Sequence, residues 1–402
     1  MIPYGEQTIT EEDTLSVTKI LRSTFLTQGP TLPLFEQAVS EHVGSKYGVA
    51  VNSASSALHI ACLALNVGQG DIVWTSPNSF VASANCALHC GAQIDFVDID
   101  PKTYNMSIEA LEEKLRDAEI LGTLPKVVIP VHYAGQPCDM ASIENLSKRY
   151  NFKIIEDASH AIGAHYFDYR INRASSQSHA HSPKVQVGAC VHSDITVFSF
   201  HPVKIITTGE GGIAMTNDSN LAERMSRLRS HGITRIFDQT HNNPDNEIWN
   251  YQQDELGFNY RMTDLQAALG LSQLTRLKDF VSKRHEIANI YNSAFHDVPI
   301  INPWQHPNSY SSYHLYPICI DTNFCRRSQK EIFTFLQNNG ISVNLHYIPI
   351  HRHPLYKDLG FSVGDYPEAE SFFRRTITLP IYPTLSELDQ NQVIRSVREA
   401  TL

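Results

Sequence analysis

The sequence predicts an α/β protein, with one large, mainly parallel β-sheet covered by helices on both faces and a smaller C-terminal α/β unit. Between residues 45 and 230, short apolar runs alternate with stretches of helical periodicity, which is typical of such a sheet. Most of these runs are β-branched and apolar on both faces, as buried parallel strands are. The chain of 402 residues is also longer than one domain of ~150 residues requires.

The elements of the large unit follow from the apolar runs and from the residues that stop helices. Two short helices are expected ahead of the sheet, over residues 11–22, with Thr10 as the N-cap, and over residues 32–43. Strands are expected over residues 47–51, 72–75, 94–98, 127–131, 153–156, 196–200 and 212–216. Helical patterns between them, such as 56–66 and 80–90, end before Gly68 and Gly91, which favour helix ends.

A second unit is expected after residue 262. Residues 263 to about 295 form a long helical pattern, with apolar spacing at Leu265, Leu269, Leu271 and Leu274. It is followed by strand 314–320, helix 327–338, Gly340, strand 341–347 and a helix near 385–399. The sequence therefore predicts a large domain over residues 1–262, which includes the N-terminal helices, and a linking helix with a small domain over residues 263–402.

Composition and charge exclude several classes of protein. Apolar residues make up 42% of the chain and charged residues 18%, ordinary values for a soluble globular enzyme. The formal charge of −10 excludes a non-specific nucleic-acid binder, although a local basic pocket for a phosphorylated substrate remains compatible with it. No basic segment precedes Lys19 and no run of ~18 apolar residues occurs, so neither a signal peptide nor a membrane span is expected.

The seven cysteines are scattered and form no CxxC pair, so we interpret them as free thiols of a cytoplasmic protein.

Residues 172–186 are polar and rich in Ser and His, which indicates a surface loop inserted between two strands. His179 and His181, with Cys190 and His192 nearby, are an alternative metal site. Their spacing matches no recognised ligand set, so a solvated loop is favoured and no metal is expected.

Lys204 lies in the segment SFHPVKIITTGEGG, residues 199–212, which follows the end of a predicted buried strand. Most lysines are solvated surface charges. At a strand end inside a low-dielectric crevice, however, a lysine has a depressed pKa and its amine can form a Schiff base. The glycines that follow allow the backbone to come close to a bound group.

Asp157 follows the predicted strand 153–156, in the segment EDASH. Carboxylates at the carboxyl ends of parallel strands point into the ligand crevice of an open α/β sheet. Asp157 could instead be a helix N-cap. The functional interpretation pairs it with a protonated pyridine nitrogen, which keeps the ring cationic and able to withdraw electrons from a carbanion.

Two further segments complete the pattern. Residues 52–58, NSASSAL, place small residues at a helix N-terminus, which suits a phosphate, although a serine there is first of all a cap. Phe80 follows another strand and is either core or a flat surface for a cofactor ring. A lysine, an acid, a phosphate cradle and an aromatic ring at the strand ends of one sheet fit pyridoxal 5′-phosphate (PLP) better than any other cofactor.

The order of these motifs resembles that of the DegT-type sugar aminotransferases, which have the PLP-dependent transferase fold type I. The resemblance runs through IPYG at 2–5, LTQG at 26–29, NSASSA at 52–57, SFVA at 79–82, EDASHA at 156–161, SFH at 199–201 and GFNYR at 257–261. Within the family, LTQG, HLYPI at 314–318 and HYIPI at 346–350 resemble most the aminotransferases of pseudaminic acid biosynthesis. Those enzymes act at C4 of UDP-4-keto-6-deoxy-N-acetyl-β-L-altrosamine.

The resemblance implies a role for each matching cofactor residue. Lys204 matches the catalytic lysine that binds the cofactor, Asp157 the acid at the pyridine nitrogen, and Phe80 the residue stacked on the ring. His160 matches the position beside the ring hydroxyl. The residues that match the phosphate cradle are Ala54, Ser55, Ser199 and, from the partner subunit, Asn259. A homodimer with shared active sites is therefore implied.

The resemblance also implies the substrates. The nucleotide-sugar site is matched by Tyr4, Thr24, Phe25, Leu26, Thr27, Arg261, Asn344, Leu345, His346 and Tyr347. The implied reaction moves the amino group of L-glutamate to C4 of the UDP-linked keto-sugar in two half-reactions, with Lys204 moving the proton. Another nucleotide-linked keto-sugar, aminated at C4 or C3, is the main alternative. A PLP-dependent sugar dehydratase, in which a histidine replaces the lysine, and a non-catalytic sensor are less favoured.

Overall fold

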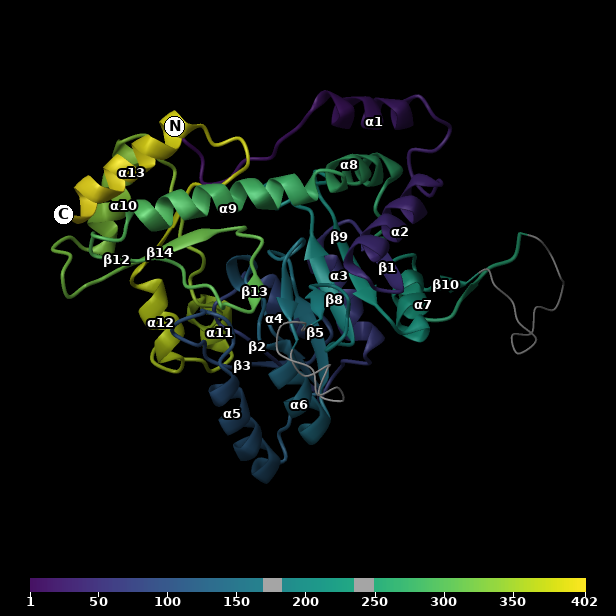
Figure 1. The fold of residues 1–402 in the computed structure, drawn as a ribbon. Coiled ribbons are helices and arrows are strands. Elements are labelled where there is room, and N and C mark those ends of the chain that lie inside the picture. The colour runs from purple at the N-terminus through teal and green to yellow at the C-terminus, as the bar shows by residue number, and fades with distance from the viewer. Residues whose placement is uncertain (169–182, 235–248) are drawn as a thin grey trace.

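A seven-stranded sheet lies at the centre of the part of the chain that the structure describes (Figure 1). The computed structural model describes residues 1–168, 183–234 and 249–402. The strands lie in the order β1-β9-β8-β5-β4-β2-β3. Their bounds are Tyr47–Val51 (β1), Ile72–Thr75 (β2), Gln93–Phe96 (β3), Val127–Ile129 (β4), Lys153–Asp157 (β5), Ile195–Ser199 (β8) and Gly212–Thr216 (β9).

The predicted α/β fold with a mainly parallel sheet is confirmed. Strands β3, β2, β4, β5 and β8 run parallel to one another, whereas β9 is antiparallel to both β1 and β8. The connection 200–211 contains no helix to cross the sheet, so the chain returns beside β8 in the opposite direction. Three predicted strands, 47–51, 72–75 and 212–216, agree at both ends, and the others differ by one or two residues.

Helices cover both faces of the sheet, and the side chains of each strand alternate between them. On one face, α3 (Ala54–Ala64), α4 (Ala82–His89) and α7 (Ser219–Leu228) pack on residues such as Val49 and Val51. On the other face, Ala50 packs with α2 (Thr31–Val43) and α8 (Asp264–Leu274), and Val128 packs with α5 (Ile108–Leu121) and α6 (Met140–Tyr150). This alternation is the two-residue period of a strand buried on both faces.

The expected helices at 11–22 and 263–295 form with local differences. Helix α1 (Glu11–Leu21) starts at Thr10 in a capping box with Asp13, as the N-cap prediction requires. The long helical pattern is two helices, α8 and α9 (Leu277–Ala294), and a turn at residues 275–276 separates them. In Figure 1, α8 and α9 extend along one side of the sheet toward the C-terminal unit.

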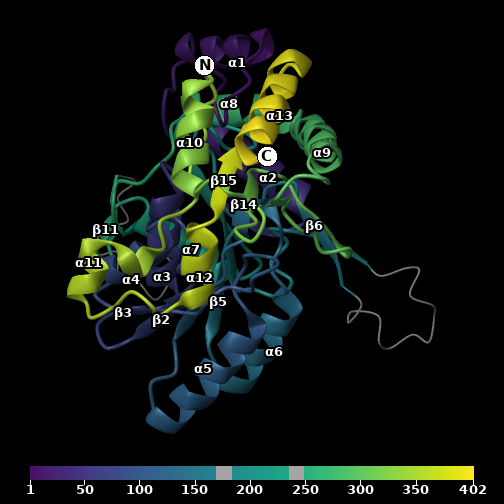
Figure 2. The ribbon, with the colours of Figure 1, turned by 90° about the vertical axis from the view of Figure 1, so that its left-hand side faces the viewer.

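The C-terminal unit contains a three-stranded antiparallel sheet, and α10 and α13 lie side by side against it (Figure 2). Its strands are β12 (Ile300–Ile301), β14 (Tyr316–Ile320) and β15 (Thr376–Leu379). Its helices are α10 (Gln329–Asn338), α11 (Pro354–Asp358), α12 (Pro367–Phe373) and α13 (Glu387–Thr401). Ile2 pairs with Ile341 and packs in the core of this unit, so the first residues reach it from the other end of the chain.

The predicted strand at 341–347 is wrong. Only two isolated bridges occur there, Ile2 with Ile341 and Asn344 with Thr378. The Asn344 side chain accepts a hydrogen bond from the amide of Leu345 at 2.8 Å, and the His346 ring bonds the Thr378 hydroxyl at 2.9 Å. These side-chain bonds replace a regular ladder, because an asparagine offers the backbone a local alternative partner.

The predicted insertion at 172–186 is described only in part. Its last residues form β7 (Lys184–Gln186), which pairs with β6 (His165–Phe167) and is therefore strand, not loop. β6 also pairs with β13 (Ser309–Tyr310). Residues 172–182, with His179 and His181, lie outside the described residues.

His192, named above in the alternative metal site, has protein partners instead. Its Nδ1 lies 2.9 Å from Glu144 and its Nε2 lies 2.6 Å from Asp168. Within the described ranges, no group of three or more ligating side chains could hold a metal ion. None of the helices in these ranges is long and apolar enough to cross a membrane. All seven cysteines are free thiols, as expected.

Candidate active site

A cavity of about 550 Å³ opens at the carboxyl ends of β5 and β8. The sequence-predicted residues that line it are Tyr4, Ala54, Ser55, Phe80, Asp157, His160, Ser199, Lys204, Asn344, Leu345, His346 and Tyr347. They come from segments far apart in the sequence. The strand ends, the N-terminus of α3 and the C-terminal unit therefore surround one volume of the size of a small-molecule site.

Lys204 lies in the turn after β8. Its amide donates to the carbonyl of His201 at 2.9 Å, and the Phe200 amide and carbonyl are tied to Gly211 and Thr208, which closes the loop. The amine faces the cavity, and among the described residues it has no ion-pair partner within 4.0 Å. Burial lowers the pKa of Lys204 to about 8, against the opposing effect of the Asp157 charge. A large fraction of the amine is therefore neutral near physiological pH and able to react as a nucleophile or base.

This shift predicts a pH effect on the stability of the cofactor-free protein. In the unfolded chain Lys204 keeps its proton up to its ordinary pKa of 10.5, whereas in the folded protein it loses the proton near pH 8. The unfolded state therefore binds more protons between these values, and the free energy of unfolding rises with pH across this window. Urea titrations of wild type and Lys204→Met should diverge there, with only wild type gaining this increment. Parallel curves would show that the pKa of Lys204 is not depressed in the folded protein.

Asp157 ends β5 with its carboxylate in the cavity, where two donors hold it. The Ser83 hydroxyl donates to Oδ2 at 2.6 Å and the Ser159 amide donates to Oδ1 at 3.1 Å. The Ser83 hydroxyl also lies 2.7 Å from the hydroxyl of Ser79, which lies in the bend before α4. These bonds fix the orientation of the carboxylate, as a partner for a cationic ring nitrogen requires.

The N-terminus of α3 supplies the expected anion site. Ser53 caps the helix by accepting from the Ser56 amide at 3.1 Å, while the amides of Ala54 and Ser55 have no acceptor within the described residues. Free amides at a helix start bind phosphate because the helix dipole favours negative charge there.

Gly212 explains why Ser199 lies beside these amides. It pairs with Val51 on one side and with Ser199 on the other, and a Cβ on Gly212 would lie 2.4 Å from the Ala54 amide nitrogen. Only glycine allows this approach. The amides, the Ser199 hydroxyl, the Asp157 carboxylate and the Lys204 amine together match the phosphate, ring nitrogen and aldehyde of PLP. The residues present therefore fit this cofactor.

Four aromatic or imidazole side chains close the opposite side of the cavity. His160 lies 3.0 Å from the Tyr347 hydroxyl, and its ring is 4.5 Å from the ring of His314. Burial and the charge of Lys204 hold the pKa of His160 and of His314 well below the usual range, and they lower the pKa of His346 to about 3. These imidazoles are therefore neutral and provide uncharged donors and acceptors for a polar substrate.

Other predicted residues do not line this cavity in the single chain. Phe25 and Leu26, with Thr24 and Thr27 beside them, lie away from it and are 53% and 47% exposed. Asn259 pairs with Ser230, and Arg261 pairs with Val51 at the edge of the sheet. None of these side chains lines the cavity within the described chain, so their roles remain predictions.

The structure adds residues that the sequence did not single out. Lining residues outside the predicted set include Ser53, Ser79, Ser159, His201, Glu210 and His314, and Ser83 lies behind Asp157. The i, i+4 spacing of Ser79 and Ser83 is the one signal in the sequence for the Asp157 contact, and it is common among helices that hold no site.

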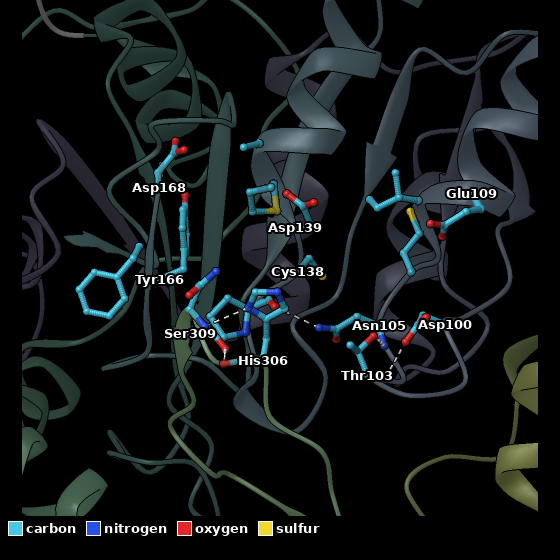
Figure 3. Close-up of a pocket in the computed structure, with 17 residues that line it drawn as sticks. Asp100, Thr103, Asn105, Glu109, Cys138, Asp139, Tyr166, Asp168, His306 and Ser309 are labelled. Carbon is cyan, nitrogen blue, oxygen red and sulfur yellow. Dashed lines mark hydrogen bonds between the residues drawn. The ribbon is translucent and has the colours of Figure 1, made fainter. Parts of the chain in front are cut away.

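A second cavity, of about 470 Å³, lies near β6, α5 and α6 (Figure 3). Its described lining includes the acids Asp100, Glu109, Asp139 and Asp168, with His306, and contains no lysine or arginine. Asn105 also borders this cavity. Its side chain donates to the carbonyls of Gln136 and Pro137 and accepts from the amide of Tyr133. This cavity therefore lacks the anion site and the amine that PLP requires.

A half-buried lysine with a depressed pKa and a fixed aspartate at strand ends, beside a helix start with free amides, define an active site of PLP-dependent transferases with fold type I. The chain belongs to the DegT/DnrJ/EryC1/StrS aminotransferase family, whose profile matches residues 7–398. The predicted fold and enzyme class are thereby confirmed.

Curated relatives cover nearly the whole chain. It is 35% identical over 394 residues to the UDP-4-amino-4,6-dideoxy-N-acetyl-β-L-altrosamine transaminase of Campylobacter jejuni serotype O:2, covering 97% of this chain and 94% of that protein. It is 36% identical over 401 residues to the spore coat polysaccharide biosynthesis protein SpsC of Bacillus subtilis, covering 99% of this chain and 96% of that protein.

Solved structures agree with the fold. Helicobacter pylori PseC, described as an aminotransferase involved in the biosynthesis of pseudoaminic acid, superimposes with a TM-score of 0.84 and 32% identity, over 100% of this chain and 99% of that chain. The PLP form of the sugar aminotransferase Spr1654 of Streptococcus pneumoniae superimposes with a TM-score of 0.83 and 29% identity, over 99% of this chain and 98% of that chain.

Proposed function

We propose that this enzyme transfers the amino group of L-glutamate to C4 of UDP-4-keto-6-deoxy-N-acetyl-β-L-altrosamine, a step of pseudaminic acid biosynthesis. The observation that carries the proposal is the single cavity that unites Lys204, Asp157 and the α3 N-terminus with polar side chains of the C-terminal unit. The relatives named for the altrosamine transaminase and for pseudoaminic acid support this choice of substrate. Pyridoxal 5′-phosphate is the cofactor, as in the PLP form of Spr1654.

The residues around the cavity divide the work of the reaction. The amides of Ala54 and Ser55 and the Ser199 hydroxyl hold the cofactor phosphate, and Phe80, which is 59% exposed, offers a free ring face for stacking. Asp157, held by Ser83, keeps a proton on the ring nitrogen. When bound, the cofactor supplies an electron sink that stabilises the negative charge left on the donor's α-carbon.

Lys204 is the group that moves protons. Its depressed pKa provides a neutral amine, which can take the proton from the α-carbon of the donor. In the second half-reaction the same amine works in the reverse direction on C4 of the sugar. Tyr4 and, from the C-terminal unit, Asn344 and His346 position the sugar, because they present neutral polar groups in the cavity that Lys204 lines.

The substrate is tested directly by supplying UDP-4-keto sugars that differ at C2, C3 and C5, and by locating the new amine by NMR. The proposal predicts preference for the L-altro isomer and amination at C4. Faster turnover of a D-gluco 4-keto sugar, or amination at C3, would assign the enzyme to another keto-sugar.

We also propose a homodimer in which Asn259 and Arg261 of one chain complete the site of the other. Both side chains lie outside the cavity of their own chain, although the Tyr260 carbonyl accepts from the Asn52 amide at 2.8 Å, next to the phosphate cradle. A carboxamide and a forked, charged guanidinium are suited to phosphate oxygens. The proposed domains, 1–262 and 263–402, are supported by one cluster that Ile2 shares with β12, β14, β15, α10 and α13, whereas α11 and α12 pack on the core of the large sheet.

Subunit complementation tests the shared site. In a mixed dimer of Lys204→Ala and Asn259→Ala chains, one site carries both changes and the other carries neither. Co-refolding two inactive variants should therefore restore activity, up to roughly half of the wild-type rate per mixed dimer. If mass spectrometry shows mixed dimers that stay as inactive as their parents, the two residues serve one site from one chain.

A further inference from the structure

The hydrogen bond between His160 and Tyr347 has a direction that the surrounding backbone sets. The two atoms in contact are His160 Nε2 and the Tyr347 hydroxyl oxygen, 3.0 Å apart. On the other side of the ring, the amide of Ala134 donates to His160 Nδ1 at 3.3 Å. Nδ1 must therefore carry a lone pair, and a neutral imidazole with a free Nδ1 carries its single hydrogen on Nε2. His160 is the donor and Tyr347 the acceptor.

His160 is held firmly in this state. Its backbone carbonyl accepts from the Ser312 hydroxyl at 2.6 Å, and the residue is buried, which holds the pKa of the ring well below the usual range, so the ring stays neutral. Ala134 adopts φ 56° and ψ 4°, a left-handed conformation that is unfavourable for a residue other than glycine. Strained backbone of this kind is found at functional sites, where the surrounding structure imposes it. In this turn the Ala134 amide donates to the His160 imidazole.

The direction of this hydrogen bond determines where the Tyr347 hydroxyl hydrogen points. Because its oxygen accepts from His160, the hydroxyl hydrogen must point elsewhere, and no acceptor for it lies within hydrogen-bond distance among the described residues. Tyr347 lines the cavity that Lys204 and Asp157 also line. Burial and the Asp157 charge raise the pKa of Tyr347, so the hydroxyl keeps this proton.

We propose that Tyr347 is an obligate hydrogen-bond donor to an electron-rich oxygen of a group bound in the cavity, with His160 as the residue that fixes its direction. Two bound groups offer such an oxygen, the phenolic oxygen of the cofactor ring and the keto oxygen of the sugar substrate. The inference rests on the proposed function, since it takes the cavity as the place where cofactor and keto-sugar meet.

The test compares Tyr347→Phe with Tyr310→Phe in the PLP-loaded full-length enzyme. Phenylalanine keeps the ring and removes only the donor. Tyr310 is a matched control, because its ring is stacked between His165 and His285 outside the cavity and its hydroxyl has no hydrogen bond in the described part of the chain. One arm measures the absorbance maximum of the loaded enzyme and its retention of PLP without substrates. The other measures kcat and KM for the keto-sugar, and separately the half-reaction with glutamate.

Each outcome decides the proposal. If the oxygen belongs to the cofactor, Tyr347→Phe shifts the absorbance maximum and weakens PLP retention roughly tenfold or more, as loss of one hydrogen bond to a charged partner predicts. If it belongs to the sugar, kcat/KM for the sugar falls about 10- to 100-fold, while the spectrum and the glutamate half-reaction stay unchanged. A Tyr347→Phe enzyme indistinguishable from Tyr310→Phe in both arms overturns the proposal.

A second measurement addresses the tautomer itself. In cofactor-free protein labelled with ¹⁵N-histidine, the signals of His160 are identified by their loss in His160→Gln. We expect a protonated Nε2 and a free Nδ1, and the opposite pattern would overturn the proposal. Because neither the tautomer nor the PLP arm uses the sugar, both still report on Tyr347 if wild type aminates no 4-keto sugar and the proposed function fails.

Discussion

Replacing Lys204 with alanine is expected to abolish amine transfer, with kcat at least ~10³-fold below wild type. Lys204 is the one lysine that lines the cavity among the described residues, and no neighbouring side chain with comparable basicity can take over the movement of the proton. His160, His314 and His346 are poor substitutes, because burial and the charge of Lys204 hold the pKa of each below its usual range.

The folded state should tolerate this change, because Lys204 has no carboxylate within ion-pair distance in the described structure. Lys153→Ala is the matched control. Lys153 is an exposed lysine at the opposite end of β5, paired with Asp194 at 2.9 Å on the surface. We expect it to retain wild-type kcat and KM. Measurable turnover by Lys204→Ala within tenfold of wild type would show that another base performs the reaction.

The second large effect is expected for Asp157→Asn, with a fall of about 10²- to 10⁴-fold in the half-reaction with glutamate. In wild type the Ser83 hydroxyl donates to Asp157 Oδ2 at 2.6 Å. Asparagine keeps an oxygen that can accept this hydrogen bond. What is lost is the negative charge that keeps a proton on the cofactor ring nitrogen. Without that proton the ring withdraws electrons poorly, and the α-carbon proton leaves slowly.

A graded comparison separates the charge of Asp157 from its positioning. Ser83→Ala removes one neutral donor and keeps the carboxylate, so stopped-flow rates of the glutamate half-reaction should fall only about 5- to 20-fold. The order Asp157→Asn, then Ser83→Ala, then wild type is the expected ranking. Equal losses in both variants would mean that placement of the side chain, and not its charge, carries the effect.

The sheet was predictable because its strands are short, β-branched runs that end in turn residues. Those patterns gave correct places for all the strands from β1 to β9 that make up the large sheet. They could not show that β9 is antiparallel, since direction depends on how the connection 200–211 folds back. The region 341–347 looked like a strand for the same reason, but Asn344 and His346 use their side chains locally and the chain bends along the cavity.

The site was predictable where function depends on strand ends and only partly where it depends on helix faces. Lys204 follows β8 and Asp157 ends β5, so their place in one crevice follows from the parallel sheet. Ser83 gave no such signal, because a serine inside a helix is seldom a ligand of a catalytic carboxylate. Asn259 and Arg261 lie outside the cavity of the single chain, so the single chain gives them no place in the site.

The central claim is that the amine of Lys204 is where this protein holds PLP. The direct test is to load wild type with PLP, reduce it with borohydride, digest it and map the cofactor adduct by mass spectrometry. We expect one modified lysine, Lys204, in the peptide that spans Ser199 to Gly212, and no adduct in Lys204→Ala. An adduct on another lysine such as Lys184 or Lys153, or a protein that takes up no cofactor at all, would contradict it.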